Sequence, residues 1–559
     1  MRSLRPYAMS LSLLLLLPAF VGHLAPQAHG LGHVWSARYG DADYDAVRDI
    51  AVDSDGNVIV VGNFQGTINL GGGPLYSAGS FDIFLAKFDA AGNHLWSQSF
   101  GSAEADIAFA TAVLSTGHIL IGGYFNGSIS FGGPTLVSAG SADAFIAKFW
   151  PSGAWMWSNR YGDAQYDVCS DVTHGSGGST FAVGYFAGTI DFGQGVHTSN
   201  GDYDAWLIKT DGSSGTTGWS QTFGGAQNDV GVGIASTVNG RTVITGHSYG
   251  GIDFGGGPLT SAGVYDLFLA EFEAYGAYRW SAMYGGTGPD YGFAVARQAS
   301  TDAVLLSGGF ENSASFGGAT LSSAGLEDIV FAKYDANGNH LWSQAFGGQS
   351  YDRAHGLATT LYGEVALTGY FYDTINFGGA THVTAGLLDA FIATFDITDG
   401  AYRSSLSAGD AASDNGRAIA YAPSMDLVAG GDFEGTIDLG GGPLSSAGGQ
   451  DFYLVTYTDF SHIATGDPVA ERLLLRTTPQ PAMGATTIAY RLEAPRPITL
   501  ELFTVDGRSL ARVSRGPQSA GWHRLPLAMP DGAPLPGGVF FLQLSDGEQT
   551  VRERIVVLR

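Results

Sequence analysis

The sequence contains a single cysteine, Cys169, among 559 residues, so no disulfide can form within the chain. Basic residues are also scarce: 26 lysines and arginines stand against 52 acids, for a formal net charge of -26. An acidic chain repels phosphate backbones, which disfavours nucleic-acid binding. Beyond the N-terminus no segment has the ~20 apolar residues that span a bilayer, and no window keeps a helical hydrophobic period. We therefore expect a β-rich protein with no membrane span after its leader.

The N-terminal segment has the pattern of a secretory signal peptide. Arg2 and Arg5 precede an apolar run over residues 11–21, and the small residues Ala28 and Gly30 follow it. The run is too short for a membrane anchor, which is the alternative interpretation. We therefore expect residues 1–30 to be removed and the mature protein to be secreted or held on the outer surface of a bacterial cell.

A repeat accounts for most of the 84 glycines. A Trp-Ser pair recurs at nearly constant spacing. A degenerate seventh copy has Ser404 in place of the tryptophan. The tryptophans are Trp35, Trp96, Trp157, Trp219, Trp280 and Trp342. An aspartate follows each of these seven positions at a fixed distance: Asp45, Asp106, Asp167, Asp229, Asp290, Asp352 and Asp414. A second aspartate stands later in each repeat: Asp82, Asp143, Asp204, Asp266, Asp328, Asp389 and Asp451.

Each repeat predicts four strands. In the first repeat, β-branched and aromatic residues gather at 46–52, 57–64, 82–88 and 94–100, and turn residues separate these segments. Four strands per repeat, seven times over, are typical of a seven-bladed β-propeller with four-stranded blades. A solenoid, the alternative, would need capping repeats with a polar outer face. We predict an all-β chain with the propeller over residues 31–462.

The phase of the repeat predicts how the ring closes. A Trp strand at His33–Tyr39 precedes the first full repeat, and the strand Asp451–Asp459 ends the last repeat without a Trp strand of its own. If the first strand completes the last blade, both open sheet edges disappear, and open edges promote aggregation. The prediction is a one-plus-three closure.

The first set of aspartates is the candidate binding site. These residues precede the innermost strand of each blade, which by analogy with propellers places seven carboxylates near one mouth of the central channel. Close carboxylates raise one another's pKa values or attract a cation. The favoured interpretation is structural: each aspartate of either set accepts backbone N–H bonds within its own turn. No catalytic constellation or metal motif is present, so we predict no catalytic residue, no metal ligand and no cofactor.

Other repeated positions also have structural interpretations. The tryptophans are predicted to pack between neighbouring sheets, with a carbohydrate platform as the alternative. All four lysines occupy one repeat position where other copies have Glu271, Thr394 or Thr456, which predicts a partly exposed strand face. Cys169 is predicted to be a small buried hydrophobe, and His247 a tolerated surface substitution. The four lysines are Lys87, Lys148, Lys209 and Lys333.

The repeat resembles the bacterial seven-bladed β-propeller repeat family. The segments that carry the resemblance are Asp89–Gly101, Asp335–Gly347 and Ala51–Gly62, with the patterns DxxGNxxWSxxFG and AVDxDGNVxVxG. The loop Asp53–Asn57 also has a faint likeness to a calcium loop, but it lacks the later bidentate glutamate.

Composition changes near Thr465, where prolines become frequent and half of the chain's arginines follow without any lysine. Alternating segments predict a small Ig-like β-sandwich at 476–559, after a linker at 463–475. Its strands are predicted at 486–492, 498–505, 510–513, 522–527, 539–544 and 551–558. This part resembles the C-terminal sorting domain of the type IX secretion system, through Pro479-Gln480-Pro481, residues 486–492 and 502–508, Gly537-Gly538-Val539-Phe540-Phe541 and the end 554–559. The resemblance implies export across an outer membrane with the secretion machinery as partner.

These features predict a secreted or surface-located, non-catalytic β-propeller scaffold for binding or adhesion to an unknown protein or glycan. Two alternatives stay open: a secreted polysaccharide hydrolase or lyase that uses acids at the channel mouth, and a cation-stabilised structural protein of the envelope. An enzyme should show one blade whose channel-facing residues differ from those of the other six.

Overall fold

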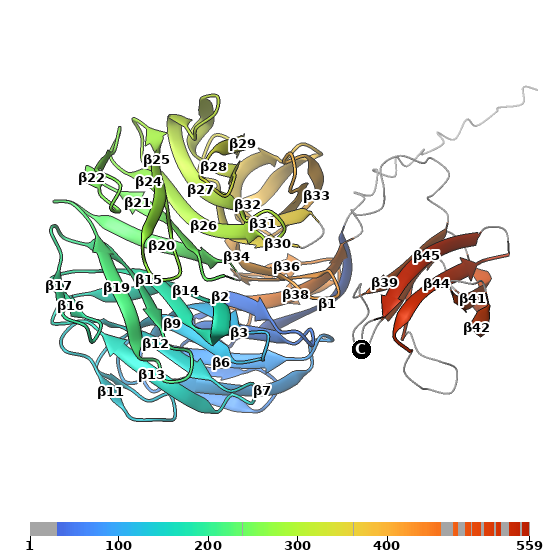
Figure 1. The fold of residues 1–559 in the computed structure, drawn as a ribbon. Helices are drawn as coiled ribbons and strands as arrows, with labels where there is room; N and C mark the ends of the chain where they lie inside the picture. Colours follow the sequence, from blue (N-terminus) through green and yellow to red (C-terminus); the bar gives the residue numbers. More distant parts are fainter. Residues whose placement is uncertain are drawn as a thin grey trace, which may run out of the picture.

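The computed structural model describes residues 31–237, 239–360 and 363–459, and in the C-terminal part 473–478, 487–492, 495–504, 508–518, 521–526, 536–547 and 550–557. These residues form an all-β structure (Figure 1). Apart from the short 3-10 turn η1 (Ser176–Gly178), no helix occurs in the ranges just given. The predicted signal peptide, residues 1–30, lies outside them.

Antiparallel strands form seven four-stranded units between residues 31 and 459, which we number sheet 1 to sheet 7. Sheet 1 contains β2 (Asp45–Val52), β3 (Val58–Phe64), β6 (Asp82–Phe88) and β7 (His94–Phe100); sheet 2 contains β8 (Ile107–Val113), β9 (Ile119–Phe125), β12 (Asp143–Phe149) and β13 (Trp155–Tyr161). Sheet 3 contains β14 (Asp167–His174), β15 (Thr180–Phe186), β18 (Asp204–Thr210) and β19 (Thr217–Phe223); sheet 4 contains β20 (Asp229–Ser236), β21 (Thr242–Ser248), β24 (Asp266–Phe272) and β25 (Tyr278–Gly286). Sheet 5 contains β26 (Asp290–Gln298), β27 (Ala303–Ser315), β28 (Leu321–Tyr334) and β29 (His340–Phe346); sheet 6 contains β30 (Arg353–Thr359), β31 (Glu364–Asn376), β32 (Thr381–Asp396) and β33 (Tyr402–Ala408). Sheet 7 contains β34 (Asp414–Tyr421), β35 (Asp426–Phe433), β38 (Asp451–Asp459) and β1 (Leu31–Tyr39). A short pairing of β25 with β27 links sheets 4 and 5.

Sheet 7 is made from both ends of this region. Its strand order is β1-β38-β35-β34, and β1 pairs antiparallel with β38 from Leu31 opposite Asp459 to Tyr39 opposite Phe452. Arg38 of β1 also forms an ion pair with the buried Asp451 of β38. Figure 1 shows the blue β1 beside the orange β38. The pairing of the first strand with the last repeat, predicted from the repeat phase, is confirmed.

Short hairpins extend five of the sheets at their outer side. In these hairpins the structure pairs two or three residues on each side of a glycine-containing loop. The hairpins are β4 (Thr67–Asn69) with β5 (Pro74–Tyr76), β10 (Ser128–Ile129) with β11 (Leu136–Val137), β16 (Thr189–Asp191) with β17 (Val196–Thr198), β22 (Gly251–Ile252) with β23 (Leu259–Thr260), and β36 (Thr436–Asp438) with β37 (Pro443–Ser445). In sheets 5 and 6 the long strands β27, β28, β31 and β32 continue through the same region.

The first strand of each sheet lies against the first strands of its neighbours, so these seven strands are innermost. The hydrophobic core lies between adjacent sheets. Ile59 and Phe100 of sheet 1, for example, belong to one buried cluster with Ile121 and Phe145 of sheet 2. Since each cluster needs two sheets, no sheet buries its apolar faces without its neighbours.

The repeated tryptophan joins five of the seven sheets to the next one. Trp96 Nε1 donates to the carbonyl oxygen of Pro151, in the following repeat, over 3.2 Å. Gly153 has a positive φ of 83°, and a Cβ at this position would lie 3.1 Å from the Trp96 ring. Glycine is therefore needed here for both the backbone conformation and the close approach of the ring. The same tryptophan-to-turn bond recurs at Trp35, Trp157, Trp219 and Trp342. These bonds support the packing interpretation.

The lysine position is buried in six of the seven repeats, and only Lys209 is half-buried, which corrects the prediction of a partly exposed face. The exposed fractions of Lys87, Lys148 and Lys333 are 7%, 2% and 5%. Lys148 Nζ donates to the carbonyl oxygen of Gly212 over 2.7 Å, and Lys333 Nζ to that of Ile397 over 2.7 Å. Both acceptors belong to turns of the next sheet, so the lysine amine stays hydrogen-bonded although it is buried. The residues found at this repeat position do not reveal these backbone acceptors, because the acceptors belong to another repeat.

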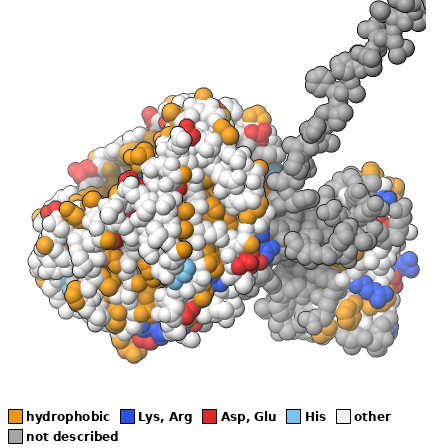
Figure 2. Space-filling view, turned by 90° about the horizontal axis from the view of Figure 1, so that it is seen from above, with side chains coloured by type: hydrophobic (Ala, Val, Ile, Leu, Met, Phe, Trp, Pro, Cys, Tyr) orange, Lys and Arg blue, Asp and Glu red, His pale blue; other side chains and the backbone are white. Residues whose placement is uncertain are grey.

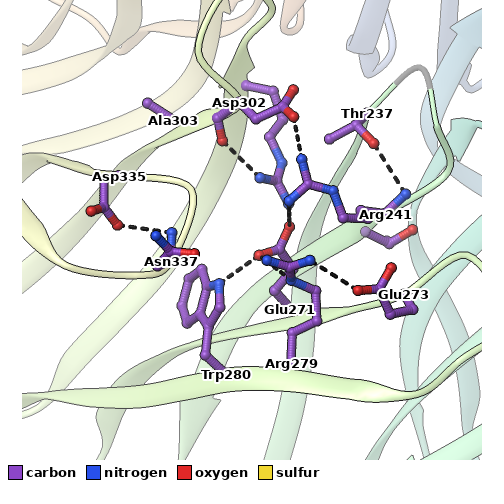
Figure 3. A network of polar contacts seen from close by, with 12 residues as sticks. Thr237, Arg241, Glu271, Glu273, Arg279, Trp280, Asp302, Ala303, Asp335 and Asn337 are labelled. Carbon is purple, nitrogen blue, oxygen red and sulfur yellow. Dashed lines mark hydrogen bonds and ion pairs between the residues drawn. The ribbon is translucent and has the colours of Figure 1, made fainter.

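In sheet 4 the same position is Glu271, and the charge pattern around it is reversed (Figure 3). Its fully buried carboxylate contacts three arginines, and Trp280 Nε1 donates to it. Arg297 Nη2 lies 2.6 Å from Oε1, Arg279 Nε lies 3.3 Å from Oε2, and Arg241 Nη1 lies 3.6 Å from Oε1. Asp302 and Glu273 pair with the outer sides of Arg241 and Arg279. Because Arg297 belongs to β26 of sheet 5, this network joins sheets 4 and 5.

The described C-terminal residues form two sheets. The first has the order β39-β40-β43, and the second β42-β41-β44-β45. Buried residues from both, among them Tyr490, Leu500, Leu542 and Ile555, form one cluster. The strands lie where they were predicted, but β39 begins inside the segment predicted as a linker. The bounds are β39 (Leu473–Thr478), β40 (Thr487–Leu492), β41 (Arg496–Thr504), β42 (Ser509–Gln518), β43 (Gly521–Pro526), β44 (Gly538–Ser545) and β45 (Thr550–Val557).

Hydrophobic side chains are spread over the face shown in Figure 2, and acidic and basic groups form small, separate patches on it. None of the described residues belongs to a helix long and apolar enough to cross a membrane.

Candidate functional site

All seven aspartates of the first set are fully buried. In each of them one carboxylate oxygen accepts the backbone N–H of the residue four positions earlier. The bond from Asp163 N to Asp167 measures 3.0 Å, and the bond from Ser102 N to Asp106 measures 2.7 Å. The equivalent bonds occur at Asp45, Asp229, Asp290, Asp352 and Asp414. These bonds agree with the interpretation that each aspartate closes its own turn. Ligand binding by the seven aspartates stays a prediction.

The second set lies next to the first. Asp143 and Asp167 flank Gly162 so closely that a Cβ there would lie 2.5 Å from Asp167 Oδ2 and 2.9 Å from the carboxyl carbon of Asp143. Ala139 N donates to Asp143 over 3.2 Å, so this carboxylate also closes its own turn. Each sheet boundary therefore holds a pair of buried carboxyl groups, one from each set.

Burial raises the pKa values of the first set strongly, because backbone N–H bonds compensate only part of the lost hydration. The pKa is about 8 for Asp167 and Asp290. It is about 7 for Asp45, Asp106, Asp229, Asp352 and Asp414. The neighbouring aspartate of the second set raises the pKa further in each case, as Asp143 does for Asp167.

The raised pKa values predict that the protein is more stable at pH 5 than at pH 8. The folded state binds more protons than the unfolded state between pH ~4, the ordinary aspartate pKa, and pH ~8, so the free energy of unfolding falls as pH rises through this window. Burial lowers the pKa of His247 to about 4 and that of His355 to about 3, which opposes this trend below pH ~6.5, but the seven aspartates outnumber these two groups. Asp53 and Asp335 have lowered pKa values and favour unfolding only at still lower pH. Thermal melts at the two pH values measure the difference.

Asp167→Asn is the matched variant for this prediction. The amide oxygen still accepts the N–H of Asp163, but the group no longer titrates. We expect a melting temperature a few degrees higher than that of the unmodified protein at pH 8, and no gain at pH 5. An equal loss of stability at both pH values would contradict the assignment of a proton to this carboxyl group.

A different set of residues faces the channel. Each innermost strand contains a β-bulge soon after its aspartate, where the register to the second strand shifts, as between Val47 and Asp49. A bulge places one extra residue outside the regular ladder and re-aims its side chain. The seven bulge residues are Arg48, Phe109, Ser170, Val232, Phe293, His355 and Arg417. All seven line one cavity of about 510 Å³, to which every sheet contributes.

One arc of this cavity is cationic, and it comes from sheets 6, 7 and 1. Arg417 forms a two-pronged contact with Asp432, with Nη2 2.9 Å from Oδ2. Arg48 Nε donates to Asn63 Oδ1 over 2.7 Å, and within the described part of the chain no acid pairs with Arg48. In the ring of bulges Arg417 lies between His355 and Arg48, and the buried Nε2 of His355 has no hydrogen-bond partner in the structure as described. Burial and the nearby arginines lower the pKa of His355 to about 3, so it is neutral at pH 7.

The opposite arc has a phenylalanine at each end, Phe109 and Phe293, and each packs against further rings. Phe109 lies 5.7 Å from Tyr124, and Tyr124 lies 5.3 Å from Tyr166 (distances between ring centroids). On the other side Phe293 lies 5.8 Å from His355 and 6.1 Å from Tyr291. His247 packs beside these rings: its own ring lies 5.0 Å from Tyr291 and 5.3 Å from Tyr265, and its Nδ1 is buried. His247 is therefore packed between tyrosines, and the prediction of a surface substitution is wrong.

Two carboxylates also line the cavity. Asp49 Oδ2 accepts the N–H of Thr111 over 2.7 Å, and Asp171 Oδ2 accepts that of Ile234 over 2.9 Å. Each carboxylate thus bonds to the inner strand of a neighbouring sheet. Burial raises the pKa of Asp49 to about 7 and that of Asp171 to about 8. At neutral pH these groups are partly protonated, so they can donate as well as accept a proton.

The remaining candidates have structural roles. Cys169 is buried, and burial raises the pKa of its thiol well above the ordinary value, in keeping with the small hydrophobe predicted there. The calcium-like loop is closed by Lys87, whose Nζ lies 2.8 Å from Asp53 Oδ2. Among the residues that the structure describes, no group of three or more His, Cys, Asp or Glu side chains could hold a metal ion.

No family model matches the chain. The regulatory protein FlaEY of Caulobacter vibrioides is 25% identical over 386 residues, which are 64% of this chain and 39% of that protein. An uncharacterized WD repeat-containing protein of Acanthamoeba polyphaga mimivirus is 21% identical over 434 residues, 60% of this chain and 31% of that protein. The chain therefore spans less than half the length of the curated relatives it matches.

Two bacterial proteins are among the solved structures that match. The quinohemoprotein alcohol dehydrogenase of Comamonas testosteroni is 11% identical, covers 79% of this chain and 78% of its own, and has a TM-score of 0.39. PorZ, a surface component of the type-IX secretion system of Porphyromonas gingivalis, is 12% identical, covers 95% and 86%, and has a TM-score of 0.21. These neighbours are β-propeller proteins. TM-scores this low do not establish a shared function.

Proposed function

We propose that residues 31–462 form a closed seven-bladed β-propeller that acts as a non-catalytic binding scaffold, with its ligand at the bulge cavity. The observation that carries the proposal is the contrast between repeated and variable positions. The tryptophans, aspartates and glycines repeat because each sheet needs the same packing and turns. The bulge position varies from arginine to phenylalanine, serine, valine and histidine, although all seven side chains face one cavity. A cavity of about 510 Å³ is within the ~300–1,000 Å³ range of small-ligand sites.

We further propose that the protein is exported and held at or released from the bacterial surface. The basic and apolar pattern of residues 1–30 supports export. The sequence motifs of the C-terminal part and its two packed sheets support an Ig-like sorting domain that engages the secretion machinery. The one cysteine, Cys169, is buried, so its thiol is shielded from oxidants outside the cytoplasm.

The test is a binding screen of the full chain against glycans and bacterial surface proteins. We expect Phe293→Val to weaken binding by about tenfold, because it removes a cavity-lining ring while copying the residue that sheet 4 has at Val232. Tyr76→Val is the matched control, since Tyr76 is 67% exposed on the β4–β5 hairpin and far from the inner strands. Binding that is insensitive to Phe293→Val and lost in Tyr76→Val would place the site on the outer hairpins and overturn the proposal.

A polysaccharide hydrolase or lyase is the second candidate, and one observation favours it: Asp49 and Asp171 line the cavity with pKa values near neutral pH. General acid–base catalysis needs groups of this kind. A turnover assay on polysaccharides, repeated with Asp49→Asn, separates the two functions. If the unmodified protein cleaves a polysaccharide and Asp49→Asn abolishes the cleavage, the protein is an enzyme and the scaffold proposal is wrong.

A further inference from the structure

The cationic arc of the bulge cavity is an incomplete binding site. Of the three arginines near His355, Arg417 is neutralised by Asp432 and Arg353 by Glu327, with Arg353 Nη2 2.6 Å from Glu327 Oε2. Arg48 instead donates from Nε to an uncharged amide oxygen, that of the fully buried Asn63. This single bond orients the guanidinium but does not neutralise it. Arginine prefers a planar, two-pronged acceptor such as a carboxylate, and in the described chain no carboxylate occupies that place.

His355 supplies a second, independent observation. Its Nε2 is buried and has no partner among the described residues, although buried polar atoms are nearly always hydrogen-bonded. The imidazole lies between two rings, Phe293 at 5.8 Å and Tyr370 at 5.5 Å. A ligand atom that bonds to this nitrogen therefore lies beside aromatic surface as well as beside the arginines.

The flanking rings set the shape of the rest of the ligand. Tyr185 of sheet 3, which lines the cavity, is half-buried, as are Tyr370 of sheet 6 and Tyr291 of sheet 5. Tyrosine offers an apolar face and a hydroxyl group that donates and accepts, a combination that suits a ring with hydroxyl groups on its edge and C–H groups on its face. A cavity of about 510 Å³ admits a ligand of a few such rings and excludes a folded domain.

We propose that the bulge cavity binds an acidic sugar of the uronic-acid class, with its carboxylate on Arg48 and His355 and its ring against Phe293, all three of which line the cavity. This inference rests on the proposed binding function and specifies its ligand. The other acids of the cavity do not compete for Arg48, because Asp49 and Asp171 accept backbone N–H bonds from neighbouring strands.

Calorimetric titration of the full chain tests the proposal with four probes: trigalacturonate, neutral galactotriose, benzoate, and a short peptide that ends in phenylalanine. We expect trigalacturonate to bind at least about tenfold more tightly than galactotriose, since a charge-assisted hydrogen bond distinguishes them. Arg48→Ser should weaken trigalacturonate binding by about 10- to 100-fold and leave galactotriose nearly unchanged. His355→Val should weaken it by about tenfold.

Both substitutions copy residues that the repeat already has at the bulge, Ser170 and Val232, so the strand accepts them. Arg403→Ala is the control, because Arg403 pairs with Asp396 at the outer turn of sheet 6 and should leave all affinities unchanged. Equal affinity for the acidic and neutral sugars, or an unchanged affinity in Arg48→Ser, would overturn the inference. If only benzoate or the peptide binds, and Phe293→Val weakens that binding, the ligand is not an acidic sugar. The proposed binding function of the cavity would still hold. If no probe and no ligand of the wider screen binds, both fail.

Discussion

Deletion of residues 31–39 is expected to abolish cooperative folding of the ring. The deleted segment is β1, the outermost strand of sheet 7, and within the described ranges it forms the only strand pairing between the two ends of residues 31–459. Its loss leaves β38 as an open edge, because the backbone groups that faced β1 have no partner while those facing β35 stay paired. The variant should aggregate or melt without a sharp transition, as monitored by circular dichroism and size-exclusion chromatography.

The size of this effect follows from the side chains that are lost with the strand. Tyr39 packs between Phe88 at 5.4 Å and Phe452 at 5.3 Å, and Trp35 Nε1 donates to Ala90 O over 3.1 Å. Truncation of one such aromatic residue costs about 3–5 kcal/mol, so two of them approach the ~5–15 kcal/mol by which a whole domain is stable.

Val34→Ala is the control for the deletion. Val34 is 41% exposed and lies at a register shift of β1, so its truncation should leave the melting temperature within a few degrees of the original. A synthetic peptide of residues 31–39 should restore part of the transition when it is added to the deletion variant. A deletion variant that melts as sharply and as high as the full chain would show that ring closure does not stabilise the fold.

Glu271→Ala is expected to lower the free energy of unfolding by about 3–5 kcal/mol, because it leaves buried positive charge without a partner. Arg297, whose side chain is only 5% exposed, loses the carboxylate at 2.6 Å. Trp280 loses the acceptor of its indole N–H; the other five repeated tryptophans donate to a turn of the next sheet instead. Urea denaturation monitored by tryptophan fluorescence measures the change.

The neighbouring Glu273 provides the matched comparison. It is 31% exposed and pairs with Arg279 alone among the arginines of the network, over 2.9 Å. Glu273→Ala should therefore cost no more than about 1 kcal/mol, the usual value of a solvent-exposed pair. Similar losses in both variants would mean that the buried position of Glu271 does not matter, contrary to the structure.

Much of the fold could be predicted because the same local signals occur seven times. The strands β6 and β7 have the predicted bounds, and β1 pairs with β38 as the repeat phase required. Side-chain environments were less predictable. The lysine position was predicted to be partly exposed from its tolerance of glutamate and threonine. Burial at this position depends on turn carbonyls of the next sheet, which belong to a different repeat of the sequence.

The candidate site was missed for a related reason. Repetition drew attention to the aspartates, which the structure places in turns. The bulge residues are visible in the sequence as a variable position shortly after each aspartate, but only the shift in strand register shows that they face the cavity. In this ring the constant positions support the sheets, and the variable position carries the chemistry that distinguishes one sheet from another.

A crystal structure of the full chain with the tightest ligand from the binding screen is the most direct test of the bulge cavity as the binding site. We predict that the ligand lies in the cavity of about 510 Å³, in contact with Arg48 and His355, while the buried aspartates keep their turn hydrogen bonds. A ligand bound to the aspartates, or on the outer hairpins with the bulge cavity unchanged, would contradict this prediction.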